Sequence, residues 1–372
     1  MGEGACAQGV ELWRKSLDMN RRKFLLSSAG GALAAPFIVN AASKKPKIRI
    51  GQIGTKHAHA SGKIQAIREQ ADTFELVGVV EPDEARRKEV AQSEAYRDVT
   101  WMSEEQLLNT KGLKAVAIET EVSKLVATGS RAIAAGMHIH LDKSPGDSLE
   151  AFRKLLEQAE AGERIVQLGY FIRYNPAFQF MFAAVEKGWL GEIMEVDCMM
   201  GKLGSEQTRR DIGLFPGGGM FELAGHVIDP IVHMLGKPYS ETAYTRRTQS
   251  DDVADNQFAV FEFEKAIATV RINHMDPFGF PRRRFQISGD KGTIEIQQLE
   301  SGNLTLYLDE PQGTYKQGEQ KLHMPPKGGR YRGEFEDLVK AIRGESALGW
   351  TYAHDLSVHE TLLSASGMLE KR

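Results

Sequence analysis

The feature that most constrains the fold of this chain is a regular alternation of strand-like and helix-like segments after residue 46. Apolar, strand-like segments occur at 47–54, 74–80, 114–118 and 137–141. The segments between them are helix-like, as at 84–92 and 125–135. Strands that alternate with helices form βαβ units around a parallel sheet, so the sequence predicts an α/β fold that begins with such a sheet.

The turn after the first predicted strand is a candidate dinucleotide site, because parallel sheets bind ligands at the carboxyl ends of their strands. Gly54 ends this strand, where a pyrophosphate would meet backbone N–H groups and the start of a helix. Glu81 ends the second strand, and a carboxylate there favours NAD by accepting ribose hydroxyls, while two arginines shortly after it keep NADP open. Lys56 and His59 replace the second and third glycines of G-x-G-x-x-G, so an ordinary strand-to-helix turn remains the alternative.

The N-terminal segment has the pattern of an export signal. Asn-Arg-Arg-Lys-Phe-Leu-Leu at 20–26 precedes a short, weakly apolar run at 27–39 and small residues up to 42. This pattern predicts a twin-arginine signal peptide within 1–42, recognised by the twin-arginine export machinery, and a periplasmic or otherwise exported protein. The run is too short to predict a stable membrane anchor. A chance arginine pair beside a buried helix is the alternative.

Charge and length exclude some classes of protein. The 372 residues carry a formal net charge of −3, with both signs spread along the chain. A nucleic-acid-binding surface normally has a basic face, so we expect no nucleic-acid partner. The length allows two or three domains, each with its own core.

Three later segments carry a family resemblance. They are 135–145 (Ala-Gly-Met-His-Ile-His-Leu-Asp-Lys-Ser-Pro), 169–177 followed by 188–193 (Gly-Trp-Leu-Gly-Glu-Ile), and 217–229, which begins Gly-Gly-Gly. In this order they resemble the glucose–fructose oxidoreductase and inositol dehydrogenase (Gfo/Idh/MocA) family, and the likeness covers roughly 47–365.

The resemblance implies two domains after the signal segment. These are an NAD(P)-binding Rossmann domain at 47–167 and a substrate and oligomerisation domain at 168–372, an α+β domain with an open, mostly antiparallel sheet. The residues agree independently, because strand-like segments occur at 192–197, 258–263, 266–272, 284–288 and 293–296. A homo-oligomer is expected, since the open sheet of the family is often an interface.

The predicted catalytic residues are Lys143, His226 and Glu222. Lys143 follows the end of a predicted strand, and the resemblance implies that it hydrogen-bonds the reacting hydroxyl. Glu222 and His226 are four apart on a predicted helix and would share one face, where the carboxylate would orient the imidazole or both would contact one substrate. The family has Asp in place of Glu222. The alternatives are a surface lysine and an ordinary core histidine.

The remaining predicted site residues bind cofactor or substrate. Those assigned to NAD (with NADP open) are Gly54, Thr55, Lys56, His57, Glu81 and Thr120. Those assigned to substrate are Arg173, Asn175 and Asp229, although Arg173 equally suits a structural ion pair and Asp229 better suits support of its helix. Departures from the family concentrate here: Glu121 follows Thr120, Leu125 stands where the family often has His, and Ser144 separates Lys143 from Pro145.

The leading hypothesis is an exported NAD(P)-dependent oxidoreductase that acts on CH–OH groups of a carbohydrate-like small molecule (a sugar, polyol or glycoside) and retains its cofactor. An NAD-dependent glycosidase that works by oxidation and elimination, and a non-catalytic binding protein on the same fold, are alternatives. The pairs His57/His59 and His138/His140 leave a metal-dependent hydrolase open, but no metal ligand is assigned.

Overall fold

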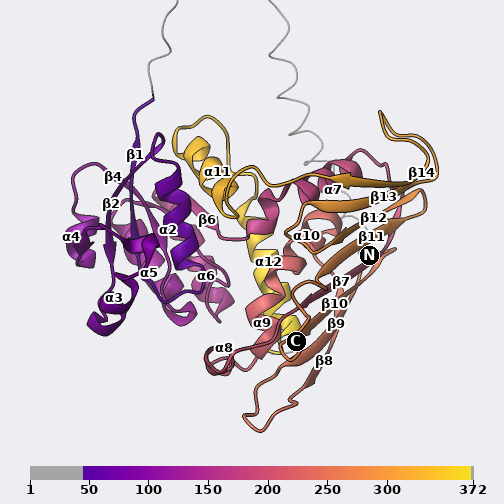
Figure 1. The fold of residues 1–372 in the computed structure, drawn as a ribbon, viewed down its shortest axis with the longest axis horizontal. Coiled ribbons are helices and arrows are strands. Elements are labelled where there is room, and N and C mark those ends of the chain that lie inside the picture. Colours follow the sequence, from indigo (N-terminus) through magenta and orange to yellow (C-terminus); the bar gives the residue numbers. More distant parts are fainter. Residues whose placement is uncertain (1–44, 370–372) are drawn as a thin grey trace, which may run out of the picture. The chain divides into compact units, whose positions relative to one another are not determined.

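The computed structural model describes residues 45–369, and Pro46–Arg372 forms one compact unit. The predicted twin-arginine signal lies outside the described residues. Two sheets organise the unit, each with its own helices (Figure 1). No helix in the described part of the chain is long and apolar enough to cross a membrane.

The first sheet, sheet A, is the predicted parallel sheet. Its strand order is β3-β2-β1-β4-β5-β6, and every pairing within it is parallel. The strands are β1 (Ile48–Ile53), β2 (Phe74–Val80), β3 (Trp101–Met102), β4 (Leu113–Ile118), β5 (His138–Leu141) and β6 (Val166–Leu168). Because the order reverses between β1 and β4, their carboxyl ends form the crevice where such folds bind dinucleotides.

Helices connect the strands of sheet A as expected for βαβ units. They are α2 (Ala60–Glu69), α3 (Glu84–Val90), η1 (Glu94–Tyr96), α4 (Glu104–Leu108), α5 (Val122–Ala134) and α6 (Leu149–Ala161). The central strand β4 is apolar at almost every position and buried from Ala115 to Ile118. A strand buried on both faces reads as a continuous apolar run, which is why the sequence predicted it well.

The second sheet, sheet B, has eight strands in the order β14-β13-β12-β11-β7-β10-β9-β8. All neighbours are antiparallel except β7 and β10. The strands are β7 (Ile193–Gly201), β8 (Ser240–Arg246), β9 (Asn256–Glu262), β10 (Ile267–Asn273), β11 (Arg284–Gly289), β12 (Gly292–Gln297), β13 (Asn303–Leu308) and β14 (Gly318–His323). This confirms the predicted α/β fold with a second, mostly antiparallel sheet.

Helices cover one face of sheet B, and no helix among residues 45–369 covers the other face (Figure 1). Side chains along β9 and β10 alternate between buried and more exposed positions, the pattern of a half-buried antiparallel strand. The helices on the covered face contact β7, β9, β10 and β12 (Figure 1). The helices that follow β6 in the chain are η2 (Phe171–Tyr174), α7 (Pro176–Glu186), α8 (Glu206–Ile212), α9 (Gly218–Leu223), α10 (Gly225–Leu235), α11 (Arg332–Ile342) and α12 (Tyr352–Ala365), of which α11 contacts α2 of the first half.

His359 on α12 makes the stability of the folded protein depend on pH. The ring packs against Phe152 of α6 with centroids 5.4 Å apart, and neither ring nitrogen has a hydrogen-bond partner among the described residues. Burial lowers the pKa of His359 to about 3. The unfolded chain binds a proton near pH 6.5 and the folded chain does not, so stability falls as pH drops from about 6.5 towards about 3.

We expect His359→Leu to stabilise the protein, and more so in acid. Near neutral pH the gain is about 1 kcal/mol, because two unpaired buried nitrogens are removed. Near pH 5 the gain grows by about 2 kcal/mol, because the proton uptake of the unfolded chain is also removed. Urea unfolding at both pH values measures the two gains, with His323→Gln on exposed β14 as control. A gain that does not change with pH would contradict this account.

Candidate active site

A cavity of about 420 Å³ lies at the carboxyl ends of β1, β2 and β4. Four of the residues predicted to bind cofactor line it: Gly54, Lys56, Glu81 and Thr120. Gly54 has a φ of +91°, and a Cβ there would lie 2.6 Å from the backbone nitrogen of Thr120. A side chain at this position would therefore push the β1 and β4 ends apart, which explains the glycine.

Glu81 lines the cavity and also holds the turn together. One carboxylate oxygen accepts hydrogen bonds from the Thr55 backbone nitrogen at 3.1 Å and hydroxyl at 2.6 Å, and the other accepts from the Asp83 nitrogen at 3.0 Å. Glu81 is 3% exposed, and Thr55 is also buried and does not line the cavity. The predicted ribose contact of Glu81 therefore competes with these three bonds.

Lys56, at the second glycine position, extends across the mouth of the cavity. Its ammonium lies 3.0 Å from Asp83, after β2, and 3.4 Å from Glu121, after β4. The lysine side chain is 33% exposed, and ion pairs of this kind contribute little stability, so the ammonium can move to a phosphate at small cost. The cavity, the glycine turn and this cation together fit a dinucleotide.

The two histidines of the turn point inwards, away from the cavity. The Nε2 atom of His57 lies 2.8 Å from the Lys143 carbonyl oxygen, which can only accept, so Nε2 carries the proton. Its Nδ1 lies 3.2 Å from Asp142, and Nδ1 of His59 lies 3.1 Å from the same carboxylate. The structure therefore places His57 beside Lys143 and not, as predicted, among the residues that line the cavity.

Lys143 is held at the end of β5 by contacts to both of its backbone groups and to its ammonium. Its N–H donates to Asp142 at 2.7 Å, and Nζ donates to the Glu222 carbonyl oxygen at 2.6 Å. The residue is 5% exposed. Burial lowers the pKa of Lys143, against the pull of the Glu222 and Asp142 carboxylates. A desolvated ammonium of this kind is a strong donor to a substrate oxygen.

The predicted single helix that carries both Glu222 and His226 is interrupted. Glu222 lies in the last turn of α9 and His226 in the first turn of α10, with Ala224 between the two helices and Gly225 packed against Tyr170. The Glu222 carboxylate instead contacts His274 at 2.9 Å, Lys202 at 3.1 Å and Lys143 at 3.9 Å. Burial opposes its ionisation, yet Lys143, His274 and Lys202 hold the pKa of Glu222 well below its usual value.

His274 and Lys202 are site residues that the sequence analysis missed. They follow β10 and β7, two strands that pair although they lie far apart in the sequence. Only a weak indication of their role was present in the sequence, namely that Lys202 and His274 each directly follow a strand that ends at the same edge of sheet B.

His226 is 1% exposed and lies against the aromatic ring of Phe171, with centroids 4.7 Å apart. Its Nδ1 has no hydrogen-bond partner within the described chain. Burial and the Lys143 and His59 side chains hold the pKa of His226 well below its usual value, so the ring is neutral. Nδ1 is enclosed by the protein, so a substrate hydroxyl would reach this neutral ring at its other nitrogen, Nε2.

A group of buried charged residues lies close to Lys143 in the interior of the protein. Glu119, at the end of β4, is fully buried, and neither of its oxygens accepts a hydrogen bond from an N–H or O–H group of residues 45–369. Burial and the Asp142 carboxylate raise the pKa of Glu119 well above its usual value. Lys63 of α2 pairs with Glu334 of α11, and both are buried. A carboxylate at the end of a buried strand was a signal for Glu119 that the sequence analysis did not use.

Two of the three predicted substrate residues lie in a buried ion network. Arg173 donates to Asp229 at 2.6 Å and also to Asp355, and His354 contacts Asp229 at 2.9 Å. Burial opposes the ionisation of Asp229, but Arg173 and His354 lower its pKa to about 2. This arrangement favours the structural alternative for Arg173 and Asp229.

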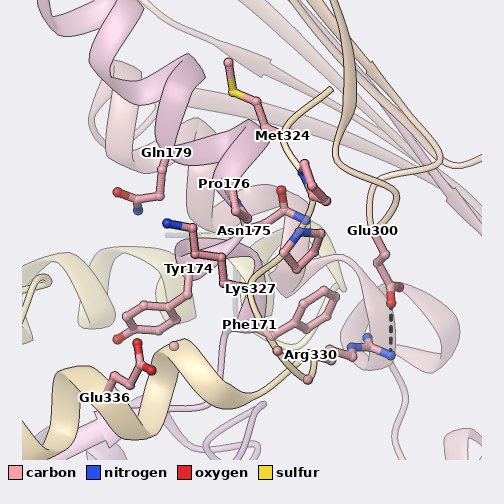
Figure 2. A pocket seen from close by; sticks show the side chains of 15 residues that line it. Phe171, Tyr174, Asn175, Pro176, Gln179, Glu300, Met324, Lys327, Arg330 and Glu336 are labelled. Atoms are coloured by element: carbon pink, nitrogen blue, oxygen red, sulfur yellow. Dashed lines mark ion pairs between the residues drawn. The ribbon is translucent and has the colours of Figure 1, made fainter. Parts of the chain in front are cut away.

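Asn175 lines a second cavity, of about 760 Å³, shown in Figure 2. Asn175 also caps α7 through the Ala177 nitrogen and donates to the Leu299 carbonyl oxygen. Arg330 crosses the cavity to Glu300 and stacks on Phe171, with its guanidinium carbon 3.8 Å from the ring centroid (Figure 2). Phe171 also contacts His226, so its ring links the lining of this cavity to the histidine.

Comparison with known proteins gives matches over both sheets. A family model described as "Oxidoreductase family, NAD-binding Rossmann fold" matches residues 48–170, and one described as "GFO/IDH/MocA C-terminal domain" matches residues 178–295. An inositol 2-dehydrogenase/D-chiro-inositol 3-dehydrogenase from Shouchella clausii is 21% identical over 261 residues, which cover 68% of this chain and 72% of that protein. Other curated relatives align over 55% of their own length.

Solved structures share the fold at low sequence identity. A UDP-N-acetylglucosamine 3-dehydrogenase from Acidithiobacillus ferrooxidans has a TM-score of 0.72 at 20% identity, covering 87% of this chain and 98% of that one. An NAD binding oxidoreductase from Klebsiella pneumoniae has a TM-score of 0.75 at 16% identity, covering 87% and 96%. The likeness extends across both sheets.

Proposed function

Because this chain belongs to the Gfo/Idh/MocA family of NAD(P)-dependent oxidoreductases, we propose that it transfers a hydride between the cofactor and a ring carbinol of a sugar, cyclic polyol or glycoside. The observation that carries the proposal is the proximity of a buried lysine ammonium, Lys143, to a neutral histidine, His226, at the carboxyl edge of sheet A, where β5 ends next to β4 and the residues after β4 line the dinucleotide cavity. Two relatives by sequence or fold are named for inositol and for a nucleotide sugar, which supports this substrate class.

The cofactor would be held by the turn at Gly54 and by the strand ends that line the cavity. Gly54 allows the close approach, Lys56 supplies a cation for the diphosphate, and Glu81 and Thr120 flank the cavity. Arg87 also lines the cavity and leaves NADP open. When bound, the nicotinamide supplies or accepts the hydride.

The chain's own residues handle the proton and orient the substrate. Lys143 donates a hydrogen bond to the reacting oxygen and stabilises negative charge on it as the hydroxyl proton leaves. The neutral imidazole of His226 accepts that proton and returns it in the reverse reaction. Glu222 stays ionised and holds Lys143, Lys202 and His274 in one arrangement, so it acts as a positioning residue.

Gly54→Ala is expected to weaken NAD binding by at least about tenfold. The added Cβ meets the Thr120 backbone and distorts the end of β4, where the cofactor binds. Gly136→Ala is the matched control, because Gly136 also has a positive φ but has nothing within 4 Å of an added Cβ. Both variants pay a similar backbone cost of about 1 kcal/mol. Fluorescence titration with NADH measures affinity, and equal affinity in the two variants would contradict the assigned cofactor turn.

Export by the twin-arginine machinery is part of the proposal and rests on the sequence pattern at 20–42. That route carries folded proteins, so a cofactor bound before export and retained between turnovers suits it, with a second substrate resetting its redox state. Mass spectrometry of protein released from the native preparation tests for retained cofactor. Fractionation of cells that express the full chain tests the location.

The reaction itself is tested with a panel of inositols, free sugars, nucleotide sugars and aryl glycosides. Net formation or consumption of NADH with a non-glycosidic polyol or sugar supports the dehydrogenase. Release of the aryl group without net NADH would instead favour the glycosidase. Protein that is folded and yet binds neither NAD nor NADP would overturn the proposal.

A further inference from the structure

A compact group of ligand atoms lies beneath Lys143 and is not explained by hydride transfer. His57, His59 and Asp142 each offer one atom, and these atoms lie within 4.8 Å of one another. All ten histidines of the chain lie in the described part, and this is the one group of three or more candidate ligands found there. The second histidine pair does not join it: His138 accepts the Ile165 N–H, and His140 bonds Gln167.

The distances suit a small divalent cation. Donor atoms about 2.1 Å from a tetrahedral zinc ion lie about 3.4 Å from one another. The distances from Asp142 to Nδ1 of His57 and of His59 are 3.2 Å and 3.1 Å. Nδ1 of His59 also lies 3.2 Å from the oxygen that His57 contacts, so both rings meet the same carboxylate and a cation between the three groups needs only small side-chain rotations.

The hydrogen bonding of His57 orients its free nitrogen towards the group. Its Nε2–H donates to the Lys143 carbonyl oxygen, so in the neutral ring Nδ1 carries the lone pair and accepts the His59 N–H at 3.2 Å. A ligating histidine usually donates its other N–H to a carbonyl or carboxylate in this way. The same contact links the group to the lysine backbone.

Glu119 supplies the second, independent observation. This carboxylate is 0% exposed, one of its oxygens lies 3.8 Å from Nδ1 of His57, and it faces Asp142. Neither oxygen receives a donor from the residues that the structure describes. Two buried carboxylates and two imidazole nitrogens thus converge with no donor between Glu119 and Asp142. The buried Lys63 ammonium interacts with both carboxylates, but its hydrogen bond goes to Glu334, so a cation or a shared proton between Glu119 and Asp142 would complete the group.

We propose that His57, His59, Asp142 and Glu119 form a binding site for a zinc-like divalent metal ion. Two imidazoles and two carboxylates are a ligand set that suits zinc, cobalt or ferrous iron and suits calcium or magnesium poorly. The bound ion ties the Gly54 turn and the end of β4 to the end of β5. Since His57 and Asp142 also bond the two backbone groups of Lys143, the site positions the catalytic lysine.

Chelator-treated full-length protein titrated with Zn²⁺ in a calorimeter tests the proposal, and Co²⁺ serves as a spectroscopic probe. We expect one equivalent to bind, a cobalt spectrum typical of nitrogen and oxygen ligands, and a rise in melting temperature with metal. His59→Gln should weaken binding by about 100-fold and the isosteric Glu119→Gln by about 10-fold or more, whereas His323→Gln on exposed β14 should not change it.

Metal binding below one equivalent in the wild type, or unchanged affinity in both His59→Gln and Glu119→Gln, would overturn the proposal and leave a shared proton as the occupant. If His59→Gln fails to fold, metal binding to Glu119→Gln still tests the proposal. NADH titration of the same samples reads the cofactor site separately. Loss of the metal site with intact NADH binding therefore leaves the proposed oxidoreductase standing.

Discussion

Lys143→Met is expected to lower kcat by about 10³-fold while NADH affinity stays within about threefold of the wild type. Methionine keeps the length and burial of the side chain but removes the ammonium that stabilises charge on the reacting oxygen. A positioned acid or base contributes about 10²–10⁴-fold to rate. The lysine lies outside the residues that line the dinucleotide cavity, so cofactor binding does not depend on it.

Lys202→Met is the matched control for this experiment. Lys202 contacts the same Glu222 carboxylate at 3.1 Å, but its side chain is 28% exposed and it lies at the edge of sheet B. We expect its loss to change kcat by less than about tenfold. Steady-state kinetics with the best substrate of the panel give kcat, and NADH fluorescence gives affinity. Comparable losses in the two variants would mean that general charge, and not the position of Lys143, supports the reaction.

The sequence predicted the elements of sheet A well because burial on both faces leaves a simple signal. Strands such as 74–80 and 114–118 are apolar runs bounded by turns, and the helices between them have regular spacing. The position of Lys143 followed from the same logic, since the end of a parallel strand lies at the ligand-binding edge. The family resemblance then supplied its role.

The directions of side chains in the turn could not be predicted in this way. Lys56 and His57 are neighbours in the sequence. Lys56 extends across the mouth of the cavity, whereas His57 donates a hydrogen bond to the Lys143 carbonyl oxygen. The direction of Lys56 depends on Asp83 and Glu121, and that of His57 on Asp142, and these carboxylates follow other strands of sheet A. The pattern of a single sequence does not predict the direction of a side chain that depends on contacts with residues of other strands.

The helix that was predicted to carry Glu222 and His226 failed for a related reason. Spacing of four residues indicates one helix face, but Gly225 packs so closely on Tyr170 that a Cβ would lie 3.0 Å from the ring. That contact is tertiary, and it favours a break that local spacing does not show. Glu222 then bonds to His274, which the pairing of β10 with β7 brings to the same edge.

Arg173→Met should reduce the free energy of unfolding by about 3–5 kcal/mol, because it leaves two buried carboxylates without their cation. Arg173 is 2% exposed, and its guanidinium bonds both Asp229 and Asp355. Arg131→Met is the control, since Arg131 pairs with Glu104 at the surface, where such a pair contributes about 0–1 kcal/mol. Adding Asp229→Asn to Arg173→Met should recover part of the loss, because one unpaired charge is removed. Urea unfolding of the wild type, the two single variants and the double variant measures these changes in stability. A small stability change in Arg173→Met together with a raised KM would instead restore a substrate-binding role for this arginine.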